Sequence, residues 1–170
     1  MPDFELKPLT ADHRRAAEAF AARIPQGDRA FIDRSLLSQV SVAGWTQRTG
    51  ARRTGAFIGD DMVAIMTVNP QQGWMKQVGE LRLVVLPEVR GKGLATALAD
   101  RAVVVATEME LRKLYVEVLE SQRRVVDMFM ALGFEQEAVL RDHVVDGDGH
   151  PGSLCILSRF LEANTDRTNQ

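Results

Sequence analysis

The amino-acid sequence predicts an α/β protein with a mixed, mostly antiparallel sheet flanked by helices. Strand-like segments rich in apolar residues are bounded by glycine, proline and aspartate. Between them lie longer segments whose apolar residues recur at helical spacing. The two kinds follow one another in the order β-α-α-β-β-β-α-β-α-β-β. With 170 residues, 45% of them hydrophobic, the chain can bury the core of one domain. We place this single domain at residues 1–161 and expect a polar, disordered tail over 162–170.

The first fifty residues predict a short strand followed by two helices. Apolar and polar side chains alternate over residues 4–6, as in a half-buried strand. Thr10 can cap the helix that follows, and the Pro-Gln-Gly turn at 25–27 ends it. Apolar positions between residues 31 and 40 predict the second helix.

A hairpin and a loop come next. Strands at about 53–58 and 62–68 are joined by a Gly-Asp-Asp turn, which is a tight hairpin signal. Residues 69–79 are expected to form a loop. Its Trp74 and Met75 are apolar side chains that a plain linker would not need. Two interpretations stay open: they line the mouth of a cleft, or they pack against a neighbouring loop.

The most informative segment covers residues 80–96, where an apolar strand runs through a glycine-bearing loop directly into a helix. Pro87 cannot donate to a strand ladder and therefore ends the strand. Gly91 and Gly93 remove side chains that would keep a ligand from the backbone. The free N–H groups of the first helical turn then favour a phosphate, and Lys92 adds a positive charge. The sequence therefore predicts an anion-binding site here.

Two common phosphate loops do not fit this segment. A Walker A loop needs Gly-x-x-x-x-Gly-Lys before Ser or Thr, and a Rossmann fingerprint needs a further glycine or alanine in an N-terminal βαβ unit. The segment instead resembles motif A of the GNAT N-acetyltransferase superfamily, Val-x-Pro followed by Arg/Gln-x-x-Gly-x-Gly/Ala. The matching residues are 85–87 and 90–95.

The resemblance continues into the family's motif B. Residues 116–122 are similar to the Leu-Glu-Val-x-x-Ser-Asn segment of the ribosomal-protein alanine acetyltransferases, and 129–134 to their Tyr-x-x-x-Gly-Phe. Two residues depart from the pattern, since Gln122 replaces Asn and Phe129 replaces Tyr. The likeness covers about residues 55–161. The elements expected in this half are a helix over 94–109, a strand over 113–120, a helix over 122–132, and strands over 135–145 and 153–160 joined by a turn at 146–149.

This resemblance implies the GNAT fold, in which the sheet is splayed between its two central parallel strands and the pantetheine arm of acetyl-CoA enters the gap. Acetyl-CoA is therefore the expected acyl donor. Its 3′-phosphate could lie near Arg123 and Arg124, although solvated surface positions are the plainer interpretation. The resemblance assigns cofactor binding to Leu83, Val84, Val85, Arg90, Gly91, Lys92, Gly93, Leu94, Ala95, Thr96, Gln122 and Phe129.

Two glutamates are candidates for the general base. Glu117 comes first because it lies at the acidic position of the alanine-acetyltransferase-like segment, inside an apolar strand. There we expect it to be partly desolvated, which would raise its pKa. Glu80 comes second because other GNAT branches place an acidic base on the motif A strand. Water is a third choice, and an ion-paired or solvent-facing Glu117 is the plainer interpretation.

The acid that protonates the leaving thiolate is missing, because Phe129 stands where the resembling enzymes carry tyrosine. A thiol leaves without strong acid help. Ser121, Tyr115 or water could then supply the proton.

The expected reaction moves an acetyl group to a primary amine of a small molecule or a protein. Trp74 and His143 are the candidates for contacting this acceptor, although a surface histidine on a strand is the plainer interpretation of His143. A catalytically silent acyl-CoA-binding sensor or interaction module of the same fold is the alternative. An acyltransferase for a longer chain stays open as well.

Composition argues against several other classes of partner. The net charge of -2 gives no basic footprint for nucleic acid, and the three histidines lack metal-ligand spacing. The single cysteine, Cys155, lies in an apolar run, which predicts a buried structural thiol. The chain opens without an apolar signal segment, and its longest aliphatic run, 102–106, is too short to cross a bilayer. We expect a soluble, cytoplasmic protein without membrane contact; a homodimer is compatible with the resemblance, although no segment identifies an interface.

Overall fold

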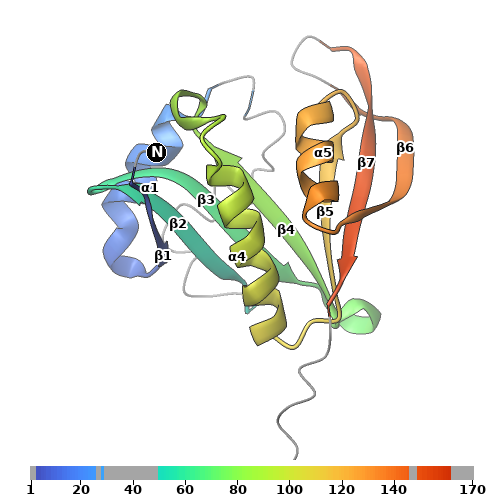
Figure 1. Cartoon of the computed structure of the whole chain (residues 1–170), viewed down its shortest axis with the longest axis horizontal. Helices are drawn as coiled ribbons and strands as arrows, with labels where there is room; N and C mark the ends of the chain where they lie inside the picture. The colour runs from blue at the N-terminus through green and yellow to red at the C-terminus, as the bar shows by residue number, and fades with distance from the viewer. Residues whose placement is uncertain (1–2, 26–27, 29–49, 146–148, 162–170) are drawn as a thin grey trace, which may run out of the picture.

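The computed structural model describes residues 3–25, 28, 50–145 and 149–161. These residues form a seven-stranded sheet with helices on both faces (Figure 1). The described strands lie in the order β1-β2-β3-β4-β5-β7-β6, and only β4 and β5 pair in parallel. This confirms the predicted mixed, mostly antiparallel sheet. The strands are β1 (Glu5–Pro8), β2 (Arg52–Ile58), β3 (Asp61–Pro70), β4 (Val78–Val85), β5 (Lys113–Leu119), β6 (Glu135–Val145) and β7 (Pro151–Phe160), and the α-helices are α1 (Arg14–Arg23), α4 (Leu94–Glu108) and α5 (Arg123–Ala131).

Helix α4 covers the left half of the sheet in Figure 1, and α5 covers the right half on the same face. The buried side chains Leu94, Leu98, Ala102 and Val105 recur every three or four residues along α4. That spacing places them on one face of the helix, which packs on β3 and β4.

Strand β3 lies at the centre of the core. Every residue from Met62 to Val68 is buried, as expected for a strand that is covered on both faces. Helix α1 also packs on β3 and contributes the buried Ala17 and Phe20. The two helices therefore hold the left half of the sheet between them.

The two parallel strands β4 and β5 pair over a short distance only. Their ladder runs from Val78 opposite Lys113 to Leu81 opposite Val116. Beyond this point β4 continues along β3 to Val85, while β5 continues along β7 to Leu119. The strands therefore diverge toward the top of Figure 1, as the splayed fold predicts.

Close approach at the start of β4 favours a glycine. A Cβ atom on Gly79 would lie 2.6 Å from Cδ1 of Leu111, which is closer than real Cβ contacts allow. Gly79 is paired with Leu114 of β5, so this close packing lies where the two parallel strands are still joined.

Apart from α1, which begins at Arg14 after a 3-10 turn, the predicted elements agree with the described ones to within two residues at each end. The main difference is the loop expected over 69–79, which is shorter because Asn69 pairs with Glu80 and Pro70 with Gly79 at the ends of β3 and β4. Instead, a 3-10 turn (η3, Gly73–Met75) occupies the middle of the connection. The helix predicted between residues 31 and 40 lies outside the described residues, as do the tail after 161 and most of the turn at 146–149.

Two further predictions are a cap at Thr10 before α1 and the bounds of β6. Before α1, the backbone N–H of Thr10 donates to Nδ1 of His13 at 3.1 Å, and a 3-10 turn (η1, Ala11–His13) precedes the helix. Strand β6 has the predicted bounds but is interrupted between Leu140 and Val144, where Asp142 adopts a positive φ of 51°.

Within the described ranges, no helix combines the length and apolar character that crossing a bilayer requires.

Candidate functional site

A cleft with a volume of about 1010 Å³ opens where β4 and β5 diverge. One wall is formed by residues 80–85 of β4, and the other by residues 116–118 of β5. The segments 89–96 and 121–125, at the starts of α4 and α5, complete the lining, with Lys92 as the exception in the first. The cleft therefore contains most of the residues that the sequence assigned to cofactor binding.

The glycine loop before α4 has the backbone that an anion site requires. Gly91 and Gly93 have φ values of 73° and 79°, in the left-handed region that favours glycine. A Cβ on either residue would meet no atom within 4 Å, and both glycines line the cleft, so their backbone faces open space. Helix α4 starts directly after Gly93, and the N–H groups of its first turn lack intrahelical partners. Loop and helix together fit a bound phosphate or diphosphate.

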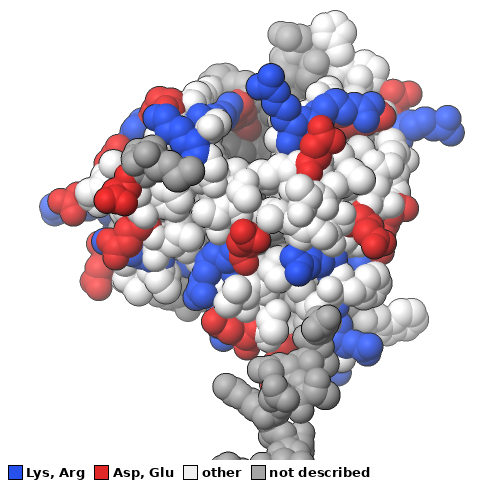
Figure 2. Space-filling view, in the orientation of Figure 1, with Lys and Arg blue, Asp and Glu red and all other residues white. Residues whose placement is uncertain are grey.

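Arginines add positive charge around this cleft. Arg90 lines it from the loop, and Arg123 and Arg124 line it from the start of α5. Figure 2 shows Lys and Arg side chains on both sides of the hollow at the upper edge of the molecule. Arg90 is fixed by a 3.0 Å hydrogen bond from Nε to the carbonyl of Val85 and by an ion pair with Asp28.

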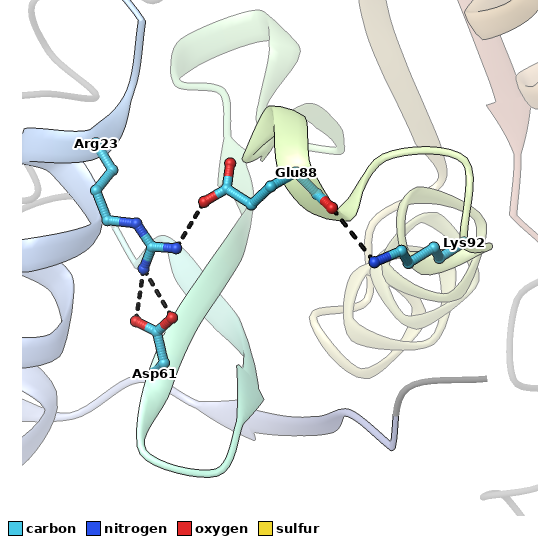
Figure 3. Close-up of polar contacts among 4 residues, drawn as sticks. All are labelled: Arg23, Asp61, Glu88 and Lys92. Carbon is cyan, nitrogen blue, oxygen red and sulfur yellow. Dashed lines mark hydrogen bonds and ion pairs between the residues drawn. The ribbon is translucent and has the colours of Figure 1, made fainter.

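The outer side of the same loop is tied to the rest of the sheet. Arg23, at the end of α1, donates to Asp61 at 2.6 and 2.8 Å and to Glu88 at 2.6 Å (Figure 3). These bonds raise the pKa of Arg23 above its usual value. The pKa of Glu88 is lowered, first by a hydrogen bond from its own backbone and then by Arg23. The loop is therefore anchored to α1 and to the β2–β3 turn.

Lys92 does not line the cleft, although the sequence assigned it to cofactor binding. Its Nζ atom points to the carbonyl oxygen of Glu88 at 3.3 Å (Figure 3). Its charge therefore lies on the outer side of the loop, because consecutive residues of a tight loop point in different directions.

The backbone of β4 offers hydrogen-bonding groups to the cleft. Alternate residues of an antiparallel strand bond to one neighbour, and the residues between them face the other side. Beyond Leu81 that other side has lost β5 as a ladder partner. Some N–H and C=O groups over 82–85 therefore face the cleft and require partners there.

The two candidate glutamates lie in different surroundings. Glu80 is 13% exposed at its side chain and accepts a 2.8 Å hydrogen bond from Nε of Arg82. Glu117 lines the cleft and is exposed, so the expectation that it is partly desolvated is wrong. Val116 and Val118, on the other face of β5, are buried, so the exposure of Glu117 belongs to its own side of the strand.

Tyr115 lies near the carboxylates of both Glu80 and Glu117. It lies opposite Glu80 in the ladder and two residues before Glu117 on the same strand face. Burial, and then the negative charges of Glu80 and Glu117, raise the pKa of Tyr115 to about 12. The phenol is therefore protonated at neutral pH, although Tyr115 does not line the cleft.

Phe129 forms part of the cleft floor. It is 1% exposed and packs edge-to-face on Phe134, with ring centroids 5.1 Å apart. Ser121 and Gln122 also line the cleft, at the start of α5. Of the three groups considered for protonating the thiolate, Ser121 is the protein side chain that faces the cleft.

Two predicted acceptor contacts lie away from this cleft. Trp74 is fully exposed on η3, before β4 begins, whereas the cleft opens where β4 ends. His143 is exposed on β6, and β7 separates that edge strand from β5. Neither residue lines the cleft.

The structure adds residues that sequence reasoning missed. Arg82 could have been found, because residues two apart on a strand share a face and it therefore meets Glu80. Asp28 carries no such signal, since it lies 62 residues from Arg90. Cys155 is buried, as predicted, and burial raises the pKa of its thiol. Among the described residues, no group of three or more His, Cys, Asp or Glu could hold a metal ion.

Comparisons with known proteins agree with this geometry. No curated relative matches the sequence. An N-acetyltransferase from Staphylococcus aureus Mu50 is 15% identical, with a TM-score of 0.77 over 94% of this chain and 99% of that one. A ribosomal-protein-alanine N-acetyltransferase from Brucella melitensis is 16% identical, with a TM-score of 0.76 over 92% and 99%. The Salmonella typhimurium protein yncA, solved with its cofactor acetyl-CoA, is 12% identical, with a TM-score of 0.77 over 95% and 96%.

At such low identities the structural matches establish the fold alone. The model of the acetyltransferase (GNAT) family, however, matches residues 16–134 of the sequence, well over half of the chain. This range contains the glycine loop, both parallel strands and the two helices that flank the cleft. The chain therefore belongs to the GNAT family of acetyltransferases.

Proposed function

We propose that this enzyme transfers an acetyl group from acetyl-CoA, the donor that its family uses, to a primary amine by direct attack. One observation carries the proposal: a single cleft joins the glycine loop before α4 (the anion loop, residues 90–93), the unpaired edge of β4 and the carboxylate of Glu117. Donor binding and proton removal would thus occur in the same space.

The cleft suits this donor in two places. The loop from Gly91 to Gly93 and the first turn of α4 would hold the diphosphate, because their N–H groups are free and no Cβ fills the space. The backbone of residues 82–85 would bond the amides of the pantetheine arm and provide a donor for negative charge on the thioester oxygen. Acetyl-CoA supplies the acetyl group already activated as a thioester.

Glu117 is our first choice for the general base. Direct attack requires a neutral amine, and most amines carry a proton at pH 7. Glu117 lines the cleft and is exposed, so an incoming amine can reach it. Glu80 also lines the cleft, but its carboxylate is held by Arg82, which makes it the second choice. A water molecule between either glutamate and the amine would serve the same purpose.

The departing thiolate requires a proton but no strong acid, since an ordinary thiol has a pKa of about 8.5. Phe129 has none to give and serves as packing. Ser121 or water would provide it from the cleft side.

The test measures release of free thiol from acetyl-CoA across a panel of amines: polyamines, amino acids, lysine peptides and peptides with alanine at the N-terminus. We expect thiol release with at least one acceptor and a large loss in Glu117→Gln. Glu135→Gln is a matched control, because Glu135 is exposed at the start of β6 and does not line the cleft. Binding of acetyl-CoA without thiol release for any amine would refute the proposal and favour a silent binding module.

A further inference from the structure

The ion pair between Asp28 and Arg90 lies inside the cleft. One carboxylate oxygen of Asp28 accepts a hydrogen bond from Nη2 of Arg90. Both residues line the cleft, and their side chains are 32% and 49% exposed. The contact therefore occupies space that is open to a ligand.

Arg90 belongs to the loop that fits the diphosphate. Its Nε–H is already used by the carbonyl of Val85, which leaves the Nη groups for other acceptors. Arginine binds phosphate and carboxylate through the same planar donors. Asp28 thus bonds the guanidinium through a group that a bound diphosphate would also use.

The charge of Asp28 also differs from that of its surroundings. The acidic side chains among the described lining residues are Asp28, Glu80 and Glu117. Glu80 and Glu117 belong to the central strands, and Glu80 is paired with Arg82. Asp28 is therefore the acid that contacts the anion loop from within the cleft, where its negative charge opposes that of a diphosphate.

We infer that Asp28 competes with the diphosphate of acetyl-CoA for Arg90 and so weakens the enzyme's affinity for its donor. This inference rests on the proposed function, because it takes acetyl-CoA to bind at the glycine loop. A second pair provides a contrast: Asp61 is bonded to Arg23 on the outer side of the loop (Figure 3) and does not line the cleft. Removal of its charge should not affect a bound diphosphate in this way.

The test compares two donors and four proteins at low salt. Affinity for acetyl-CoA is measured by calorimetry, and affinity for S-acetylpantetheine, which has no diphosphate, by NMR titration. We expect Asp28→Asn to bind acetyl-CoA about 3- to 10-fold more tightly, with the gain shrinking at high salt. Binding of S-acetylpantetheine should not change. Asp28→Glu, which keeps the charge, and the matched control Asp61→Asn should both stay within about twofold of the wild type for acetyl-CoA.

Three results would overturn the inference while leaving the donor site intact. Weaker binding of acetyl-CoA by Asp28→Asn would show that Asp28 positions Arg90 for the ligand. Unchanged binding would show that the pair does not compete. An equal gain for both donors would show an effect unrelated to the diphosphate. A wild-type protein that binds no acetyl-CoA would instead refute the proposed function, and this inference with it.

Discussion

Gly93→Asp is the most direct test of the anion loop. Gly93 has a φ of 79° and immediately precedes α4, and a Cβ there would meet no atom within 4 Å. The new side chain therefore causes no clash, and the left-handed backbone costs about 1–2 kcal/mol. Typical domains are stable by about 5–15 kcal/mol, so we expect the variant to fold.

The added carboxylate would face the diphosphate. At roughly 6 Å, with an effective dielectric constant of about 40–80, two unit charges repel by about 0.7–1.4 kcal/mol. The two charges of a diphosphate then cost about 1.4–2.8 kcal/mol, which is roughly a 10- to 100-fold rise in Kd. Loss of close backbone contact adds to this figure.

Calorimetry with acetyl-CoA measures this effect, and circular dichroism checks the fold. Gly93→Asn is the matched control, because asparagine has the same shape and tolerates the left-handed region but carries no charge. Gly59→Asp is a second control, since Gly59 has a φ of 61°, has open space around it and lies in the β2–β3 turn. Equal affinities for Gly93→Asp and Gly93→Asn would refute the placement of the diphosphate at this loop.

Three further predictions concern the acid–base groups and the cleft floor. Glu117→Gln should lower turnover by about 10²- to 10⁴-fold and leave the affinity for acetyl-CoA unchanged. The loss of turnover should be smaller at high pH, where the amine needs no base. A larger loss in Glu80→Gln would move the base to β4. Phe129→Tyr should leave turnover level or raise it modestly. Phe129→Ala should weaken donor binding and lower the free energy of unfolding by about 3–5 kcal/mol, measured by urea unfolding. Activity that appears only in Phe129→Tyr would contradict the assignment of Phe129 to packing alone. The chain has one tyrosine, so phenolate absorbance at 295 nm should titrate near pH 12, and earlier in Glu80→Gln. Because the folded state holds this proton more tightly, the corresponding stability is intact below pH 10.0 and is lost as the pH rises to about 12; a midpoint at 10.0 in the folded protein would show that Tyr115 is exposed.

Local physics made the loop and its flanking elements predictable. Proline ends a strand, glycine permits a positive φ, and a helix start leaves free N–H groups. These effects act within a few residues of the chain. Pro87 and Gly93 therefore marked the end of β4 and the start of α4 correctly, and the apolar spacing of α4 indicated the face that packs on the sheet.

Properties that depend on distant neighbours were not predictable in this way. The exposure of Glu117 depends on what packs on each face of β5, because Val116 and Val118 on the other face of the same strand are buried. The sequence left open whether Trp74 lines a cleft, because this depends on the direction of β4. Trp74 precedes β4, and the cleft opens at the carboxyl end of that strand.

The sequence by itself determined the order of the described strands and α-helices, the glycine loop before α4 and the family, because each of these depends on short segments whose conformation follows from their own residues. Only the tertiary structure decided which charges meet in the cleft. Asp28 lies against Arg90 from 62 positions away in the cleft, and Arg23 joins Asp61 and Glu88 from 38 and 65 positions away on the outer side of the loop. Such pairings follow from chain packing over long sequence separations, which no local pattern of residues encodes.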